Sequence, residues 1–263
     1  MITFLPRISS TRHPLVQACR SLASGRGEDG HVLLDGAHVL EEALAAGVDV
    51  IDVLFDGRQA ALAARAADAG ARVTEATTEA IEAASPVRQP TGIVGIARWA
   101  PGQAADLVRE ARGPIVGLVD VQDPGNVGSI IRSADALGAA SVLALDQTAN
   151  PGGWKVIRAA MGSSFRLPIG AGRSADMLQA ARANGLPIVA AIVRNGVILY
   201  AWSPPERFLL LVGHEGSGLS QPVAAWADVH VTIPMRPGID SLNVGIGTAL
   251  ILSEAARHRR GTE

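Results

Sequence analysis

Hydrophobic and polar residues are arranged along this chain in blocks of two kinds. Apolar runs of about four to eight residues, bounded by Gly, Pro, Asn or Asp, are typical of buried strands, and apolar residues recurring every three or four positions are typical of amphipathic helices. Over residues 32–97 the strand-like VLLDG, VIDVLFDG and GIVGIARW are separated by the helix-like HVLEEALAAG and ALAARAADAG. We therefore expect a compact α/β unit in this part of the chain.

A longer series of the same kind follows residue 113. It predicts strands at IVGLVDV, SVLALD, SFRLPI, PIVAAIV, FLLLVG and DVHVTIPM, and helices at 126–138, from about 154, at 174–184 and from about 242. Such regular alternation favours a mostly parallel sheet covered by helices on both faces. The segment RWAPGQAADLVREARG between the two series has Pro and Gly near its start and carries mixed charge. We expect a first domain at 1–100, a linker at 101–113 and a second domain at 114–263.

Composition narrows the setting of the protein. With 263 residues, 48% of them hydrophobic, the chain can bury a substantial core. Its apolar runs fall short of the ~20 residues that a membrane-spanning helix needs. The first residues, MITFLPRISSTRHP, lack the apolar core of a secretory signal, and the single Cys19 cannot form an internal disulfide. We expect a cytoplasmic protein with no membrane partner.

Charge is distributed unevenly although the net charge is only -2. Residues 1–26 hold four Arg and no acid, whereas residues 27–56 hold eight acids and no Lys or Arg. A basic arm facing an anionic partner and an ordinary solvated surface both fit this pattern. Lys155 is the only lysine, so Arg supplies nearly all positive charge, and Arg suits both phosphate pairing and stacking on bases.

Three blocks place polar residues directly after predicted strands. They are DVQDPGNVGSIIRSADALG at 120–138, LLLVGHEGSGLS at 209–220 and VTIPMRPGIDSLNVGIGTAL at 231–250. Because α/β folds bind ligands at the carboxyl ends of their strands, we expect these blocks to form one site. Nucleotide fingerprints and the serine-hydrolase elbow are missing: the chain has no GxGxxG after a first strand, no GxxxxGK[ST] and no GxSxG.

Each block carries candidate functional side chains. In the first, Asn126 follows a Pro-Gly turn where it can cap a helix, and Arg132 lies off that helix's apolar stripe, so it can project into a cleft. In the second, Glu215 stands at a strand end, a position for hydrogen bonding or proton handling. The structural alternatives are an ordinary helix cap for Asn126, a surface position for Arg132 and a turn acid for Glu215.

In the third block, Ser241 and Asn243 precede a strongly apolar helix. Hydroxyl and carboxamide groups at a helix start can cap the helix, but they can also orient a substrate or cofactor. His214 stands in a glycine turn of the second block, where a histidine is more often solvated, so we do not assign it a role.

These motifs resemble the SpoU, or TrmH-type, RNA 2'-O-ribose methyltransferases of the SPOUT superfamily. DPGNVGSIIRSADALG, GHEGSGLS and IPMRPGIDSLNVGIGTA are similar to that family's three motifs, in the same order. VLLDGAHVLEEALAAG and QPTGIVGIA resemble the substrate-binding domain of ribosomal protein L30e type that often precedes the catalytic domain. The chain departs from the usual pattern at a few positions: Asp35 for Glu, His214 for Asn, Pro237 for Gly, and Gly245 and Gly247 for Ser and Ala.

The resemblance implies an α/β fold with a C-terminal trefoil knot, a homodimer with the site near the subunit interface, and S-adenosylmethionine as methyl donor. No metal is required. Donor contacts are implied at Gly213, Ile233, Met235 and Leu242. Catalytic or orienting roles are implied at Asn126, Arg132, Glu215, Ser241 and Asn243.

Family proposals make Arg132 a general base, which is demanding because a guanidinium normally has a pKa above ~12. It can instead hold the adjacent phosphate and stabilise a developing alkoxide. Ribosomal RNA is favoured as substrate because the N-terminal domain resembles those of ribosomal-RNA modifiers. The alternatives are transfer RNA as substrate, a SPOUT enzyme that methylates a base, and a non-catalytic RNA-binding or ribosome-assembly factor.

Overall fold

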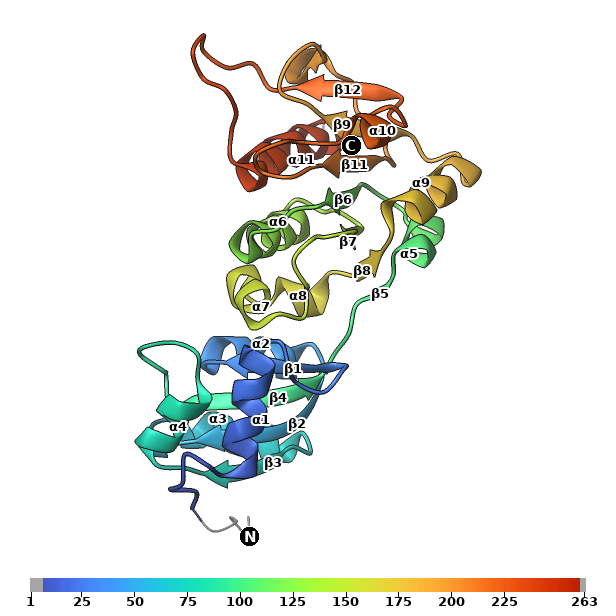
Figure 1. Cartoon of the computed structure of the whole chain (residues 1–263). Helices are drawn as coiled ribbons and strands as arrows, with labels where there is room; N and C mark the ends of the chain where they lie inside the picture. Colours follow the sequence, from blue (N-terminus) through green and yellow to red (C-terminus); the bar gives the residue numbers. More distant parts are fainter. Residues whose placement is uncertain (1–6, 261–263) are drawn as a thin grey trace. The chain divides into compact units, whose positions relative to one another are not determined.

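The chain folds into two compact units (Figure 1). The computed structural model describes residues 7–260; the first six residues, part of the segment judged to lack a secretory signal, and the last three lie outside the described residues. The N-terminal unit comprises Met1–Ala100 with Gly152–Phe165, and the C-terminal unit comprises Pro101–Pro151 with Arg166–Glu263.

The N-terminal unit is a four-stranded sheet with helices on both faces. Its strands are β1 (His31–Asp35), β2 (Asp49–Phe55), β3 (Arg72–Glu75) and β4 (Ile93–Arg98). They lie in the order β1-β4-β2-β3, with β4 antiparallel to both neighbours and β2 parallel to β3. The other elements are α1 (Pro14–Ala23), α2 (Ala37–Ala45), η1 (Gly57–Gln59), α3 (Ala60–Asp68) and α4 (Thr78–Ala84).

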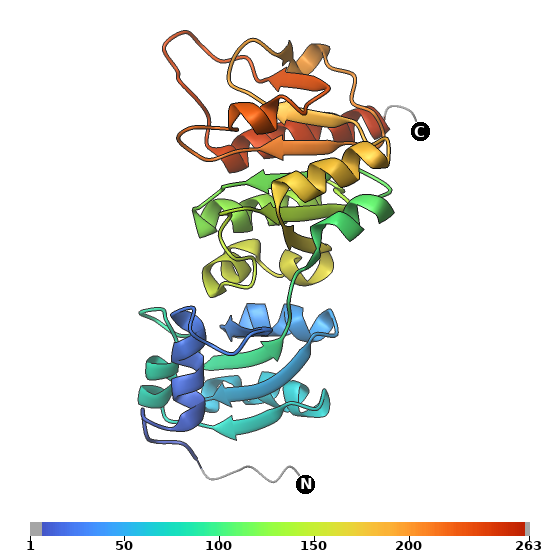
Figure 2. The ribbon, with the colours of Figure 1, turned by 45° about the vertical axis from the view of Figure 1, so that its right-hand side comes forward.

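Successive strand residues of this unit enter opposite cores, as the two-residue repeat of a strand requires. Val32 and Leu34 pack with residues of α2 and α3, whereas Leu33 packs with residues of α1 and α4. Figure 2 shows these two pairs of helices on opposite sides of the sheet. The compact α/β unit expected over residues 32–97 is therefore present.

The segment Gly152–Phe165 packs on this unit rather than on the second one. In α7 (Trp154–Ala160), Ile157 joins the core beside α2, and the Trp154 indole N–H donates to the Ala23 carbonyl at 3.1 Å. Arg158 pairs at 2.8 Å with the buried carboxylate of Asp35. Residues 152–165 thus lie outside the compact unit in which the sequence places them.

The strand expected at SFRLPI is wrong over most of its length. Residues Ser163–Arg166 form α8, in which Phe165 packs edge-to-face against Trp99. Pro168 has no N–H to offer a ladder, so the strand β8 begins only at Ile169. An apolar run with an aromatic residue does not by itself distinguish a strand from a short buried helix.

The C-terminal unit is built on one eight-stranded sheet in which every pairing is parallel. Its order is β10-β12-β9-β11-β6-β7-β8-β5. The strands are β5 (Gly102–Gln103), β6 (Ile115–Val119), β7 (Ser141–Leu145), β8 (Ile169–Gly172), β9 (Ile188–Ala191), β10 (Val197–Ile198), β11 (Leu209–Val212) and β12 (Val229–Thr232). The parallel sheet expected from the sequence is confirmed.

Helices cover both faces of this sheet. They are α5 (Ala104–Glu110), α6 (Pro124–Ala136), α9 (Ser174–Ala183), η2 (Leu199–Ala201), α10 (Gln221–Ala224) and α11 (Val244–Arg260). α5 and α9 share one core with β6, β7, β9 and β11, and α6 packs against α11. The expected linker 101–113 is therefore mostly ordered structure, because β5 joins the sheet and α5 buries Ala104 and Val108.

Helix α6 begins two residues earlier than its sequence pattern suggested. The Asp123 carboxylate, not Asn126, caps it by accepting the Asn126 N–H at 2.8 Å, and Pro124 occupies the first turn. A side-chain cap of this kind stabilises a helix by roughly 0.5–2 kcal/mol. The side chain of Asn126 is thereby left free for another partner.

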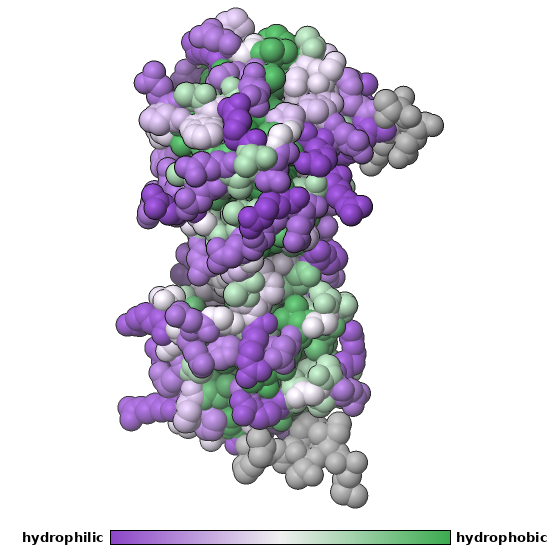
Figure 3. Space-filling view, turned by 90° about the vertical axis from the view of Figure 1, so that its right-hand side faces the viewer, coloured by the Kyte–Doolittle hydropathy of each residue, from purple (hydrophilic) through white to green (hydrophobic). Residues whose placement is uncertain are grey.

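The surface of the chain is mixed in polarity. On the face drawn in Figure 3, hydrophilic residues cover most of the C-terminal unit, and apolar residues show between them. Across residues 7–260, no helix combines the length and the apolar character needed to cross a membrane.

Candidate active site

A pocket of about 300 Å³ opens at the carboxyl edge of the parallel sheet of the C-terminal unit. Residues that follow β9, β11 and β12 line it, together with the first turns of α11. This is the edge at which parallel α/β sheets bind ligands. The volume lies near the lower end of the ~300–1,000 Å³ that small-molecule sites occupy.

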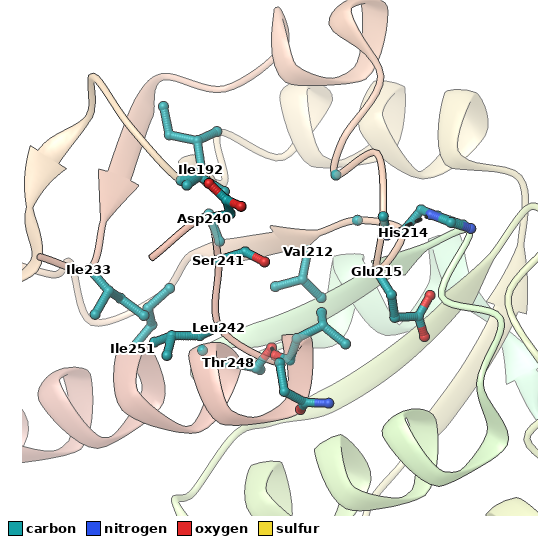
Figure 4. A pocket seen from close by; sticks show the side chains of 18 of the residues that line it. Ile192, Val212, His214, Glu215, Ile233, Asp240, Ser241, Leu242, Thr248 and Ile251 are labelled. Atoms are coloured by element: carbon teal, nitrogen blue, oxygen red, sulfur yellow. Dashed lines mark hydrogen bonds between the residues drawn. The ribbon is translucent and has the colours of Figure 1, made fainter. Parts of the chain in front are cut away.

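The pocket has apolar walls and a polar rim. Figure 4 shows Ile233 and Ile251 on one side and Glu215 and His214 on the other. The buried hydroxyl of Thr248 donates to the Val244 carbonyl at 2.7 Å. The apolar lining residues are Ala191, Ile192, Val193, Val212, Val231, Ile233, Met235, Leu242, Val244 and Ile251.

Most of the side chains selected from the sequence meet at this pocket. All four residues implied as donor contacts line it: Gly213, Ile233, Met235 and Leu242. Glu215, Ser241 and Asn243 line it as well. Ser241 is exposed and makes no hydrogen bond among residues 7–260, so its hydroxyl remains available to a ligand.

A chain of hydrogen bonds joins the three motifs beside the pocket. The Asn126 side-chain amide donates to Glu215 Oε1 at 3.0 Å, and the Asn243 amide donates to Asn126 Oδ1 at 2.8 Å. Glu215 Oε1 also accepts the Asp123 N–H at 3.1 Å. Residues that are 89 and 117 positions apart in sequence are thus in direct contact.

Glu215 fixes which group donates and which accepts in these hydrogen bonds. An ionised carboxylate can only accept, so the Asn126 amide nitrogen must face it and the Asn126 oxygen must face Asn243. The oxygen of Asn243 then points to the start of α11, where it accepts the Gly245 N–H at 2.9 Å. Asn243 therefore both caps α11, as considered from the sequence, and orients Asn126.

Hydrogen bonding sets the charge state of Glu215. Its partial burial acts to raise the pKa, but the hydrogen bonds from Asn126 and from the backbone N–H groups of Glu215, Asp123 and Gln122 together hold the pKa below its ordinary value. Because the folded pKa is depressed, this carboxylate stabilises the fold at neutral pH, and that stabilisation is lost as pH falls through the folded pKa. Glu215 thus acts at neutral pH as a fixed acceptor rather than as a proton donor.

We expect Glu215→Gln to lower the melting temperature by a few degrees, and to lower at least tenfold the methyl transfer that the sequence resemblance implies. The new amide must point its NH₂ group at donors that the carboxylate now accepts, either the Gln122 N–H, which Oε2 accepts at 3.4 Å, or the Asp123 N–H and the Asn126 amide, which both reach Oε1. Thermal unfolding and turnover measure the two effects. Glu206→Gln, at an exposed acid ahead of β11, is the matched control. Unchanged turnover in Glu215→Gln would contradict the orienting role.

Arg132 is not brought into this network within one chain. It is exposed on α6, off the buried stripe of Val127, Ile130, Ile131 and Ala134, as the helical spacing predicts. It does not line the pocket and makes no hydrogen bond or ion pair within residues 7–260. Six residues of helix rotate it about 120° away from the direction of Asn126.

Several lining residues were missed in the sequence. Ile192 and Val193 follow β9 and carry no polar signal, so their place in the pocket follows only from the sheet order, which sets β9 beside β11. Asp240 and Thr248 were not selected either, although both fall within the third block. His214 was read as solvated, but it is half-buried and its ring bonds to backbone amides.

An α/β chain that gathers these three motifs at one edge of a parallel sheet is, as a class, a SPOUT-type methyltransferase. Comparison with known families supports this class. Residues 113–253, more than half of the chain, match the SpoU rRNA Methylase family, and residues 14–95 match the MRM3-like substrate binding domain. The chain belongs to the SpoU rRNA methylase family, and the expected N-terminal substrate-binding domain is confirmed.

Relatives resemble the chain over nearly its whole length. An uncharacterised tRNA/rRNA methyltransferase of Synechocystis is 30% identical over 96% of this chain and 94% of its own. A 23S rRNA guanosine 2'-O-methyltransferase of Bacillus subtilis is 27% identical over 94% of this chain and 98% of its own. The crystal structure of an AdoMet-bound rRNA methyltransferase from Sinorhizobium meliloti superposes with a TM-score of 0.87 at 30% identity, covering 96% of this chain and 97% of that one.

Proposed function

We propose that this protein transfers a methyl group from S-adenosylmethionine to a ribose 2'-hydroxyl of ribosomal RNA. The observation that carries the proposal is the hydrogen-bond chain from Glu215 through Asn126 to Asn243, set beside an apolar pocket. Relatives named as 23S rRNA 2'-O-methyltransferases, and the AdoMet-bound structure, support the substrate and the donor.

The pocket fits the chemistry of this donor. Apolar walls such as Ile192, Ile233 and Ile251 suit an aromatic base, and the backbone of the loop 213–218 offers polar groups at the rim. Gly213 lines the pocket and is buried, and its lack of a side chain lets the backbone of Gly218 and Leu219 approach it closely. When bound, S-adenosylmethionine supplies an electrophilic methyl group on a sulfonium.

The residues of this chain act by positioning. Ser241 and Asn243 line the pocket, where they can orient the ribose. Asn126 is hydrogen-bonded to both Asn243 and Glu215 and so holds Asn243 in place. Arg132 stabilises the oxyanion that develops as the ribose hydroxyl loses its proton. Holding nucleophile and electrophile in line is the main contribution of such a site, because the reaction needs no covalent intermediate.

The proposal includes a homodimer. Ile246 and Leu250, one turn apart on α11, are 55% and 39% exposed, and Tyr200 of the adjoining η2 is 69% exposed. Exposed apolar side chains on one helix favour burial against a second copy of the same surface. The molar mass in solution tests this point. The trefoil knot implied by the resemblance stays a prediction.

Contact with RNA through the N-terminal unit is also part of the proposal. Arg12, Arg20 and Arg26 are exposed and pair with no acid within residues 7–260, whereas Arg7 pairs with Glu75 at 3.5 Å. Exposed guanidinium groups near α1 that pair with no acid in the described residues suit phosphate contacts. A cytosolic location is part of the proposal too, because the proposed substrate is ribosomal RNA and the single Cys19 is a free, buried thiol.

Mapping 2'-O-methyl groups in ribosomal RNA, from cells with and without the gene, tests the function. We expect one ribose methylation to disappear and to return with the intact gene but not with Asn126→Ala. Nucleoside mass spectrometry separates this result from a base methylation. A site that disappears from transfer RNA would make transfer RNA the substrate, and an unchanged methylation map with no donor binding would indicate a non-catalytic RNA-binding protein.

A further inference from the structure

The loop 213–218 carries Glu215 and forms one rim of the pocket. It is closed by backbone bonding: the Gly218 N–H donates to the His214 carbonyl at 2.8 Å, which pairs these two residues as an isolated bridge. Glu215, Gly216 and Ser217 therefore form the tip of a tight turn. Whatever holds that tip also sets the position of Glu215.

The ring of His214 holds the tip. Its Nδ1 accepts the Gly216 N–H at 2.9 Å and the Ser217 N–H at 3.3 Å. An imidazole nitrogen accepts only while its lone pair is free, so the ring must be neutral with its proton on Nε2. The side chain thus does what an Asn or Asp side chain does in a turn, where its oxygen accepts a backbone N–H two residues further on.

We propose that His214 is a positioning residue of the donor site and makes that site sensitive to acid. This inference rests on the proposed function, since it concerns the loop that would hold the methyl donor. In the neutral state the ring closes the loop and presents Glu215 to Asn126. Protonation places an N–H on Nδ1 against two other N–H groups, so the ring can no longer close the turn.

Three acids and one arginine lie on or near the loop. Glu215 lies on the loop itself, Asp123 stands at the start of α6 with its N–H bonded to Glu215, and Asp240 lines the same pocket with Arg194 at 3.9 Å. Hydrogen bonding holds the pKa of Glu215 below its ordinary value, so Glu215 does not titrate between pH 7.5 and 5.5. Asp240→Asn serves as the control for the second carboxylate.

The test compares His214→Asn, which keeps an acceptor, with His214→Ala, which removes it. Binding of S-adenosylmethionine is measured by calorimetry between pH 5.5 and 7.5. At pH 7.5 we expect His214→Asn to bind within about threefold of the original protein and His214→Ala about tenfold more weakly. From pH 7.5 to 5.5 the original protein and Asp240→Asn should lose about tenfold in affinity, and His214→Asn should lose little.

Two readouts do not depend on ligand binding. Nitrogen NMR should find the neutral Nε2-protonated form of His214 at pH 7.5, and the Gly216 and Ser217 amides should exchange faster in His214→Ala than in His214→Asn. Equal donor affinity of His214→Ala and the original protein at pH 7.5, or the same acid loss in His214→Asn, would overturn the inference. A protein that binds no donor at any pH, with the NMR results as expected, would overturn the proposed function instead.

Discussion

Replacing Arg132 by alanine will lower methyl transfer to RNA by at least about a hundredfold, while affinity for S-adenosylmethionine stays within about threefold of its original value. Arg132 is exposed and does not line the pocket, so its loss leaves the donor walls intact. A guanidinium that stabilises developing negative charge acts on the transition state rather than on the bound donor. Single-turnover transfer from radiolabelled donor and equilibrium donor binding measure the two quantities.

Two further variants define what Arg132 does. Arg112→Ala removes an exposed guanidinium at the opposite, amino edge of the same sheet and should leave transfer unchanged. Arg132→Lys keeps the charge but not the fork-shaped donor set, so it should recover part of the rate if the residue holds a phosphate or an alkoxide. A parallel fall in donor affinity and in transfer for Arg132→Ala would instead place Arg132 in the donor pocket.

The fold of the C-terminal unit was largely predictable because its strands are buried on both faces. Runs such as IVGLV and LLLV have no polar residue to interrupt them, and the helices between them follow a clear periodicity. The failures have local causes. The strand expected at SFRLPI failed because Phe165 packs against Trp99 in the N-terminal unit. The linker expected at 101–113 failed because the strand β5 has only two residues, too few to give a pattern, although it pairs with β8 in the sheet.

The sequence predicts which residues form the site but not which of them are hydrogen-bonded to one another. Strand ends and turn residues identify Asn126, Glu215 and Asn243, but nothing in their spacing says that Asn126 stands between the other two. That order depends on Asp123, which takes the capping role and frees the Asn126 side chain. The role of His214 depends on the path of a six-residue loop, which periodicity does not describe.

Gly213→Ala will weaken donor binding by about a hundredfold or more. A Cβ at position 213 would lie 2.4 Å from the Gly218 carbonyl carbon and 2.4 Å from the Leu219 nitrogen, both backbone atoms that cannot rotate away. The loop would have to open, which would displace Glu215 from Asn126 and change the rim of the pocket. Donor titration measures the loss, and the melting temperature shows whether the change stays local.

Gly216→Ala is the matched control for this loop. Its Cβ would meet only the His214 ring, at 3.4 Å, which is an ordinary contact, and its N–H remains to bond that ring. We expect donor affinity within about threefold of the original. Equal losses in Gly213→Ala and Gly216→Ala would mean that the loop tolerates no side chain anywhere, and the close approach of residues 213 and 218 would then not be the cause.

Together the two largest effects test where Arg132 acts. If the protein is a homodimer and Arg132 serves the pocket of the partner subunit, mixing Arg132→Ala with Gly213→Ala subunits creates one complete site in each mixed dimer: the intact pocket of the first variant meets the intact Arg132 of the second. Random mixing would then restore about a quarter of the original rate. If Arg132 serves the pocket of its own chain, every site carries a defect and the mixture stays inactive. The exposed position of Arg132, turned away from Asn126 on α6, favours the first outcome.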